Sequence, residues 1–163
     1  MLIGLTPDTL AGIIVLLKKR KFEEPVASMN ECDLTKLSSS LKTPFLRPEI
    51  ENKSEDFCEK ATHLFYLLTE NHCFSNSNKR IAVVSLITFA DINGYKISTT
   101  EVSLYALSMA TTLLTKYRLI KEAKYEINKV ISDSLTRKSG PPLSKTERIE
   151  IEKEFVEFMN RKT

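Results

Sequence analysis

The chain of 163 residues is short of several residue types, and each shortage narrows what the protein can be. It has no tryptophan and only 4 glycines, a composition that suits a helical protein better than a sheet. No apolar run approaches the roughly 20 residues that a membrane-spanning helix needs, and no stretch resembles a secretory signal peptide. We therefore expect a cytoplasmic protein without a membrane partner.

An excess of charge of one sign is also missing. The 24 basic and 21 acidic residues leave a net charge of +3, which predicts no broad basic surface for nucleic acid. The three cysteines, at positions 32, 58 and 73, are odd in number and widely spaced, which fits free thiols better than disulfides or a metal site. Cys73 lies next to His72, but adjacent residues rarely face each other and no acid is placed to orient the pair.

What the chain does have is apolar residues at helical spacing along most of its length. Thr6 with Pro7, Ser54 and Ser98 carry the cap or first-turn chemistry that predicts helix starts. Residues 80–92 are apolar nearly all round, which predicts a central, buried helix. The fold class expected from these patterns is all-α, a helical bundle around the helix at about 80–92.

Two segments interrupt the helical pattern. Two prolines predict an extended backbone over residues 43–49, and a Ser-Gly-Pro-Pro run predicts a linker over 137–143. We therefore expect a helical domain over residues 1–136 and a C-terminal helix over 144–163. That helix could pack on its own domain, on a partner or on a second copy to form a homodimer, and the sequence leaves the three open.

The stretch with the most chemistry is residues 72–80, His-Cys-Phe-Ser-Asn-Ser-Asn-Lys-Arg. Because apolar helical patterns lie on both sides, we expect a loop that leads into the central helix. The free N–H groups at a helix N-terminus and its dipole attract anions, and Lys79 and Arg80 add full charges. His72 is the group there that can move a proton near neutral pH. A phosphate site beside a general base suggests phosphoryl or nucleotidyl transfer; a solvated turn with surface charge is the alternative.

The same stretch resembles the signature of the Fic/Doc family, H-x-F-x-[DE]-[GA]-N-[GK]-R. The positions that match it in type and spacing are His72, Phe74, Asn78, Lys79 and Arg80. The likeness covers roughly residues 1–125 and is strongest over 35–100. It implies a Fic/Doc-type helical bundle with a flap over 43–49 beside the active site.

The resemblance also implies a role for each position. His72 would be the base that deprotonates a hydroxyl of the target protein, and Phe74 would anchor the loop in the core. The nucleotide phosphates would contact Ser75, Asn76, Ser77, Asn78, Lys79 and Arg80. Phe45 and Leu46 would be candidate contacts of the flap with a target peptide held by strand-like pairing; packing of both side chains into the core is the alternative.

One departure from the family concerns the metal. The acidic residue that binds Mg²⁺ in the family is Asn76 here. An amide oxygen can coordinate Mg²⁺ without contributing charge, so metal affinity should fall, and Ser75 cannot replace a carboxylate. The cofactor implied is still ATP or another nucleoside triphosphate with Mg²⁺, with Asn76 as a weak metal ligand.

Two further departures favour one branch. Ser77 and Lys79 occupy positions where adenylyl-transferring members have glycine, and Val83 replaces a second arginine that many of them carry. These features resemble the Doc (death-on-curing) branch, toxins of toxin–antitoxin modules that phosphorylate a protein of the translation machinery. The expected partners are therefore a target protein of that machinery and an antitoxin.

The function expected is a Doc-like protein kinase that moves a phosphoryl group, in preference to an adenylyl or other nucleotidyl group (AMPylation), to a Ser or Thr hydroxyl. The alternative is a catalytically decayed Fic-fold protein that binds a nucleotide or a protein. Retention of His72 favours the enzyme, and loss of the carboxylate at Asn76 favours the decayed form. An unrelated helical interaction domain is a third reading.

Overall fold

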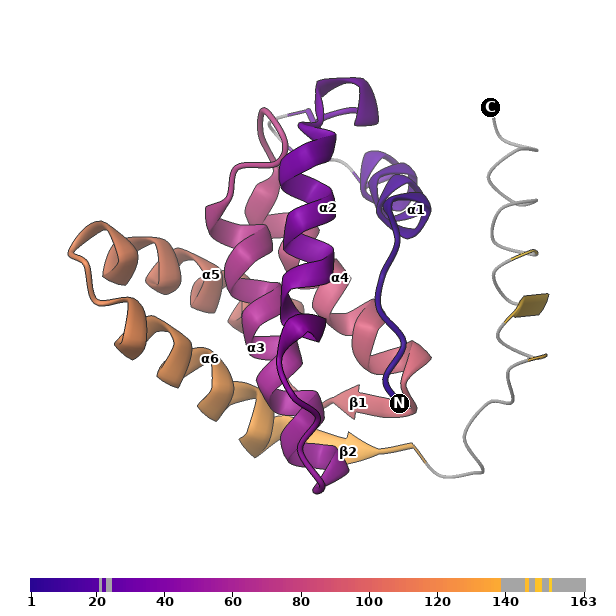
Figure 1. Ribbon diagram of the computed structural model, residues 1–163. Helices are drawn as coiled ribbons and strands as arrows, with labels where there is room; N and C mark the ends of the chain where they lie inside the picture. Colours follow the sequence, from indigo (N-terminus) through magenta and orange to yellow (C-terminus); the bar gives the residue numbers. More distant parts are fainter. Residues whose placement is uncertain (21, 23–24, 139–145, 147–148, 151–152, 154–163) are drawn as a thin grey trace.

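In a computed structural model the chain folds into a helical bundle (Figure 1). The structure describes residues 1–20, 22, 25–138, 146, 149–150 and 153. In chain order its elements are α1 (Pro7–Lys18), the 3₁₀ helix η1 (Met29–Glu31), α2 (Leu34–Lys42), the 3₁₀ helix η2 (Thr43–Leu46), α3 (Lys53–Glu70), α4 (Asn78–Ile92), β1 (Tyr95–Ile97), α5 (Glu101–Lys116), α6 (Ile120–Ser134) and β2 (Leu135–Arg137). The predicted all-α class is confirmed.

Helix α4 is the centre of this bundle. It packs against α1, α3, α5 and β1, so its apolar residues are covered on several sides. The ring of Phe89 stacks on Phe57 of α3, with 5.1 Å between ring centroids. Its buried residues are Ile81, Ala82, Val83, Ser85, Leu86, Phe89 and Ala90. The central buried helix expected from the apolar pattern is confirmed, and it places the residues just before it at the end of the bundle.

Local cap chemistry decides where the helices begin. Thr6 caps α1 as predicted, and its side chain exchanges hydrogen bonds with Thr9 in a capping box. The cap predicted at Ser54 lies two residues after the observed cap of α3, and the cap predicted at Ser98 lies two residues before the observed cap of α5. Asn52 accepts the hydrogen bonds that start α3, and Thr100 starts α5. Ser98 instead lies beside the small sheet, where its N–H donates to the carbonyl of Ser134.

The extended backbone predicted over 43–49 is wrong for its first half. Thr43–Leu46 is the 3₁₀ helix η2 with a proline in its first turn, and the backbone becomes extended only at Arg47. The fixed φ of proline suits the first turn of a helix as well as an extended chain. In addition, the hydroxyl of Thr43 donates to the carbonyl of Ser39, so the last turn of α2 runs directly into η2.

The small sheet was not predicted from the sequence. Strands β1 and β2 pair antiparallel, with Tyr95 opposite Arg137, so Arg137 belongs to a strand and not to the expected linker. Most of the predicted linker over 137–143 and of the predicted helix over 144–163 lies outside the described residues. Within the described ranges, no helix is both long enough and apolar enough to cross a membrane.

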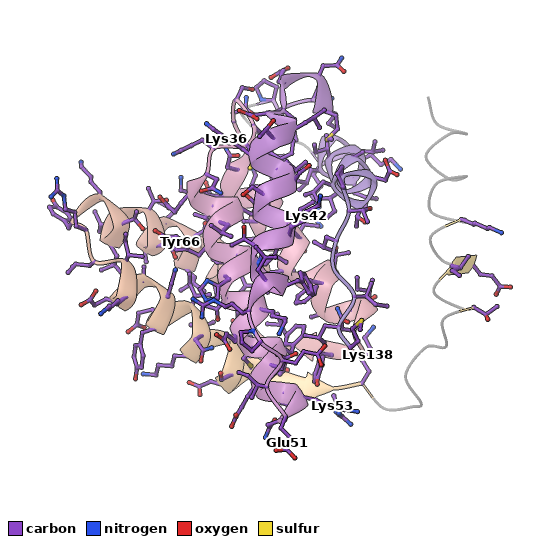
Figure 2. All side chains as sticks on the ribbon, in the orientation of Figure 1. Lys36, Lys42, Glu51, Lys53, Tyr66 and Lys138 are labelled. Carbon is purple, nitrogen blue, oxygen red and sulfur yellow. The ribbon has the colours of Figure 1, made fainter. Side chains whose placement is uncertain are left out.

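Charged side chains cover the outside of the bundle. Lys36 and Lys42 project from α2, whereas Glu51 and Lys53 lie near the start of α3 at the opposite end of the bundle from Lys36 (Figure 2). The segment just before α2 contacts residues 73–75, within the polar stretch that precedes α4.

Candidate functional site

Residues 71–77 form the loop that joins α3 to α4, and its backbone is bent at both ends. His72 has φ 48° and Ser77 has φ 65°, so two residues other than glycine adopt the left-handed conformation. This conformation costs roughly 1–2 kcal/mol for an ordinary residue. Such strain gathers at functional sites, where surrounding contacts hold it in place. We call residues 71–77 together with the first turn of α4 the motif loop.

The middle of the motif loop is held by the segment that precedes α2. Cys32 forms an isolated antiparallel bridge with Phe74, and the N–H of Asp33 donates to the carbonyl of Cys73 over 2.7 Å. Phe74 is buried, with 3% of its surface exposed. The position of Phe74 agrees with its expected role as the anchor of the loop in the core.

Asn78 fixes the shape of the motif loop from the other side. Its Oδ1 accepts a hydrogen bond from the N–H of Phe74 over 3.1 Å, and its Nδ2 donates to the carbonyl of Phe74 over 2.9 Å. Both polar atoms of the amide are therefore used inside the loop. Asn78 was expected to contact phosphate, but in this geometry its side chain positions the loop instead.

The N-terminus of α4 is open. Ser77 is the N-cap residue, yet its side chain does not accept a hydrogen bond from a backbone N–H group of the first turn. Its hydroxyl donates to Oδ1 of Asn76 over 2.7 Å and accepts from Arg80 over 3.1 Å. The N–H groups of the first turn have no partner four residues earlier within a helix. These N–H groups lie at the positive end of the helix dipole, and helix N-termini of this kind attract anions.

Two cationic side chains belong to the same turn. Lys79 is half-buried and makes no ion pair with any described residue. The guanidinium of Arg80 lies over the ring of Phe22, 4.3 Å from its centroid. Two positive charges beside an open helix N-terminus suit a phosphate chain.

The two histidines of the chain lie in different environments. His72 is exposed, and no described residue bonds to its side chain. His63, in the middle of α3, is half-buried; burial, and then the charges of Arg47 and Lys124, lower its pKa to about 4. His63 is therefore neutral near pH 7, and it lies in α3, outside the motif loop.

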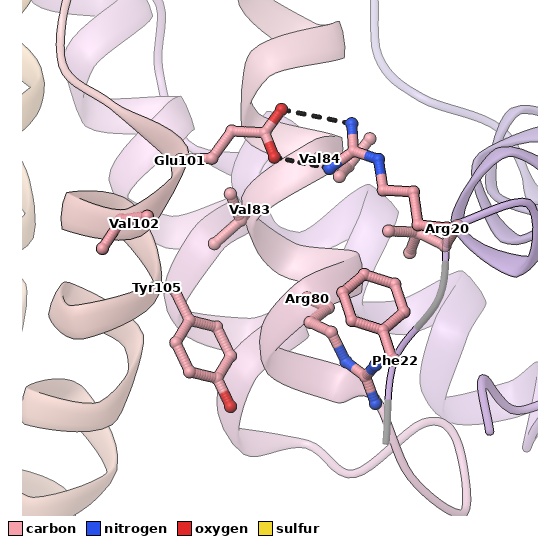
Figure 3. Close-up of a pocket in the computed structure, with 9 residues that line it drawn as sticks. Arg20, Phe22, Arg80, Val83, Val84, Glu101, Val102 and Tyr105 are labelled. Atoms are coloured by element: carbon pink, nitrogen blue, oxygen red, sulfur yellow. Dashed lines mark hydrogen bonds and ion pairs between the residues drawn. The ribbon is translucent and has the colours of Figure 1, made fainter. Parts of the chain in front are cut away.

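A cavity of about 510 Å³ opens beside Arg80, between α1, α4 and α5 (Figure 3). At one side Arg20 binds Glu101 through two hydrogen bonds of 2.5 and 3.2 Å, and this pairing keeps the pKa of Glu101 below its usual value. The residues that line the cavity are Leu17, Arg20, Phe22, Arg80, Val83, Val84, Glu101, Val102 and Tyr105. Arg80 thus faces both the motif loop and a largely apolar cavity.

The two residues predicted to contact a target peptide, Phe45 and Leu46, are neighbours in η2 but differ in burial. Phe45 is partly buried against the core and meets Phe89 edge to face, with 6.1 Å between ring centroids. Leu46, in contrast, is 81% exposed. Of the two candidate flap contacts, the structure therefore places Phe45 in the core, and Leu46 alone is free to meet another molecule.

Sequence reasoning missed one acidic residue at the site. Glu31, at the end of η1, accepts a hydrogen bond from the hydroxyl of Ser75 over 2.5 Å. It lies 44 residues before Ser75 in the chain, in a segment without helical periodicity. Nothing in the sequence pattern could have placed it there, because the contact depends on the bridge between Cys32 and Phe74.

The oxygen atoms around the motif loop can be compared with what Mg²⁺ requires. Glu31 offers a carboxylate, Asn76 an amide oxygen, and Ser75 and Ser77 hydroxyls. No three His, Cys, Asp or Glu side chains in the described part of the chain lie close enough to hold a metal ion by themselves. Mg²⁺ often needs only one or two protein carboxylates because substrate phosphates and water complete its coordination. The donor set fits a cation that arrives with a nucleotide.

Comparison with known proteins finds a match to one family model. The model of the Fic/DOC family matches residues 18–90, a span that contains η1, α2, α3, the motif loop and most of α4. No curated protein and no solved structure matches the chain. Proteins of this family are in general transferases, so the match supports a transferase-type function in general terms.

Proposed function

We propose that the chain is a Doc-like transferase that moves the terminal phosphoryl group of a nucleoside triphosphate to a Ser or Thr hydroxyl of a target protein. The observation that carries the proposal is the open N-terminus of α4, where the side chain of Ser77 leaves the first turn uncapped. Arg80 in that turn connects it to the cavity. An uncapped helix start beside an apolar cavity suits a ligand with phosphates at one end and a ring system at the other.

In this proposal the phosphates lie against the first turn of α4. Its N–H groups donate hydrogen bonds to the phosphate oxygens, and Lys79 and Arg80 add charge. The base and sugar of the nucleotide enter the cavity, which is lined by Phe22 and Tyr105 among other residues. Mg²⁺, when bound with the nucleotide, supplies neutralisation of phosphate charge, with Asn76 as one oxygen ligand.

His72 carries the proton transfer. A neutral imidazole nitrogen takes the proton of the target hydroxyl, and the hydroxyl oxygen then forms a bond to the terminal phosphorus. The bond between that phosphorus and the bridging oxygen breaks, and the nucleoside diphosphate leaves with the electron pair. The exposure of His72 supports this role because an incoming protein hydroxyl can reach it.

The partners follow from the same proposal. A target protein presents the hydroxyl, and the likeness to the Doc branch implies a protein of the translation machinery. The exposed Leu46 is a candidate contact with this target. An antitoxin would restrain the activity, and a homodimer through the helix predicted over 144–163 would be a further assembly. We place these events in the cytoplasm.

A second candidate function is a decayed Fic-fold protein that binds a nucleotide or a partner without transfer. The observation that favours it is Asn76, which stands at the position of the metal-binding acid. The strained φ of 65° at Ser77, where the family has glycine or alanine, points the same way.

The test is transfer of label from ATP in a bacterial lysate. ATP labelled at the γ-phosphate should mark a protein with the native chain and leave it unmarked with His72→Ala. Label from the α-phosphate alone would change the proposal to nucleotidyl transfer. ATP binding without label from either position would favour the decayed protein.

The same pair of variants can be compared in cells. Expression of the native chain should slow the growth of a bacterial host, and His72→Ala should relieve it. Equal harm from both forms would exclude transfer as the cause of the toxicity.

A further inference from the structure

We propose that Glu31, which lies outside the motif loop in sequence, supplies the carboxylate for the divalent cation of the bound nucleotide in place of the acid that is absent at Asn76. This inference rests on the proposed function, because it concerns the same nucleotide. It assigns to η1 a part in the site that no residue of the 72–80 stretch can play, since that stretch contains neither Asp nor Glu.

The backbone holds Glu31 beside the loop. Cys32 is paired antiparallel with Phe74, and the N–H of Asp33 donates to the carbonyl of Cys73. In an antiparallel pair each step back on one strand meets a step forward on the other, so Glu31 lies opposite Ser75. The hydrogen bond from the Ser75 hydroxyl to Oε2 of Glu31 agrees with that register. Position 75 is the immediate neighbour of Asn76.

The carboxylate of Glu31 is also available. Glu31 is exposed, and none of the ion pairs between described residues includes it. Its hydrogen bond uses Oε2, which leaves Oε1 open to a further ligand. A carboxylate without a cationic partner beside a phosphate site would repel the phosphates. A divalent cation between them removes that repulsion.

The competing explanation is that Glu31 only positions the loop through Ser75. The two roles differ in how the effect of Glu31→Gln depends on metal. If Glu31 binds the cation, Glu31→Gln should weaken ATP binding in Mg²⁺, whereas without metal the loss of a negative charge should leave ATP binding unchanged or tighter. If Glu31 only positions the loop, the amide oxygen of glutamine can still accept the hydrogen bond from Ser75, so ATP binding should change little and by the same factor with and without metal.

The experiment is calorimetric titration of ATP in Mg²⁺ and in EDTA, on four forms of the full chain. These are the native chain, Glu31→Gln, Asn76→Asp and the double variant. We expect Glu31→Gln to weaken binding in Mg²⁺ by about tenfold or more, the size that mutations around metal ligands typically have. In the double variant the new carboxylate at position 76 should restore the affinity in Mg²⁺.

Two further variants act as controls. Glu51→Gln makes the same change of charge at the opposite end of the bundle from the start of α2 (Figure 2), and it should leave both affinities unchanged. Ser75→Ala removes the hydrogen bond to Glu31 and should weaken binding in Mg²⁺ less than Glu31→Gln does. Circular dichroism of each variant reports whether the fold is kept.

The outcomes separate the inference from the function on which it rests. If Glu31→Gln binds ATP in Mg²⁺ as the native chain does, or loses affinity equally in EDTA, Glu31 is not the cation ligand and the proposed function stands. If the native chain binds no ATP in either condition while properly folded, the proposed function and the inference both fail.

Discussion

Helix α3 is flanked by two loops that differ in how firmly they are held. The exit loop, residues 71–77, buries Phe74 and is tied to α4 by two hydrogen bonds, one that the Asn78 amide accepts and one that it donates. The entry segment, residues 43–52, buries Phe45 in part but leaves Leu46 81% exposed. The exit loop is thus firmly held, whereas the entry segment leaves one apolar side chain exposed.

The difference shows two ways in which a loop acquires its shape. In the exit loop, a polar side chain four residues away bonds both backbone groups of Phe74. The entry segment instead depends on distant contacts: Phe45 meets Phe89 of α4, and a Cβ added at Gly4 would lie 3.0 Å from the Phe45 ring. The first kind of loop should lose stability when one residue changes, and the second should tolerate change at its exposed position.

The largest effect is expected at Phe74. Replacement by alanine removes a ring that is 3% exposed and leaves a cavity. Such Phe→Ala changes lower the free energy of unfolding by about 3–5 kcal/mol. Urea denaturation followed by circular dichroism measures the change. A loss below about 1 kcal/mol would mean that Phe74 does not anchor the loop.

A smaller but clear loss is expected at Asn78. Asn78→Ala leaves the N–H and the carbonyl of Phe74 without their partners. Each buried group left unpaired costs about 1–3 kcal/mol, and water can reach this half-buried position. We therefore expect Asn78→Ala to lower the free energy of unfolding by about 1–3 kcal/mol, measured by urea denaturation. Asn76→Ala, which loses one bond from the neighbouring hydroxyl of Ser77, is the control and should cost less than Asn78→Ala.

The stability of the folded chain should depend on pH through His63. The pKa of His63 is about 4 in the folded chain against an ordinary value of 6.5. Between these values the unfolded chain binds the proton more readily, so stability falls as the pH is lowered from about 6.5 to 4. Thermal unfolding across that range should show a smaller loss of stability in His63→Gln than in the native chain. Equal losses in the native chain and His63→Gln would contradict the low pKa.

The smallest effect is expected at Leu46. Because its side chain is 81% exposed, Leu46→Ala should change the free energy of unfolding by no more than about 0.5 kcal/mol. Phe45→Ala is the matched change at the neighbouring residue, and it should lower the free energy of unfolding by clearly more than Leu46→Ala does. Comparable losses from the two variants would mean that both side chains pack in the core.

Much of this architecture could be predicted from the sequence because it depends on local patterns. The run of apolar residues after Arg80 is enough to place α4 in the core. Thr6 and Pro7 are enough to start α1. The polar stretch between two helical patterns could only be a loop that leads into a helix, and the structure places it there.

Features that depend on distant parts of the chain could not be predicted. The bridge between Cys32 and Phe74, which brings Glu31 to the site, joins segments 42 residues apart (74 minus 32). The helical turn at Thr43–Leu46 was missed because proline is compatible with both states, and the contact of Phe45 with Phe89 lies outside any local window. The pairing of β1 with β2 has the same origin, because three-residue strands carry no periodicity of their own.

The central claim is that nucleotide phosphates bind at the start of α4. The most direct test is an NMR titration of the ¹⁵N-labelled chain with ATP and Mg²⁺, following the backbone amide signals. The account predicts saturable shifts of the Asn78, Lys79 and Arg80 amides, together with Tyr105 in the cavity. Saturable binding that leaves these amides unmoved, or no binding to the folded chain, would contradict it.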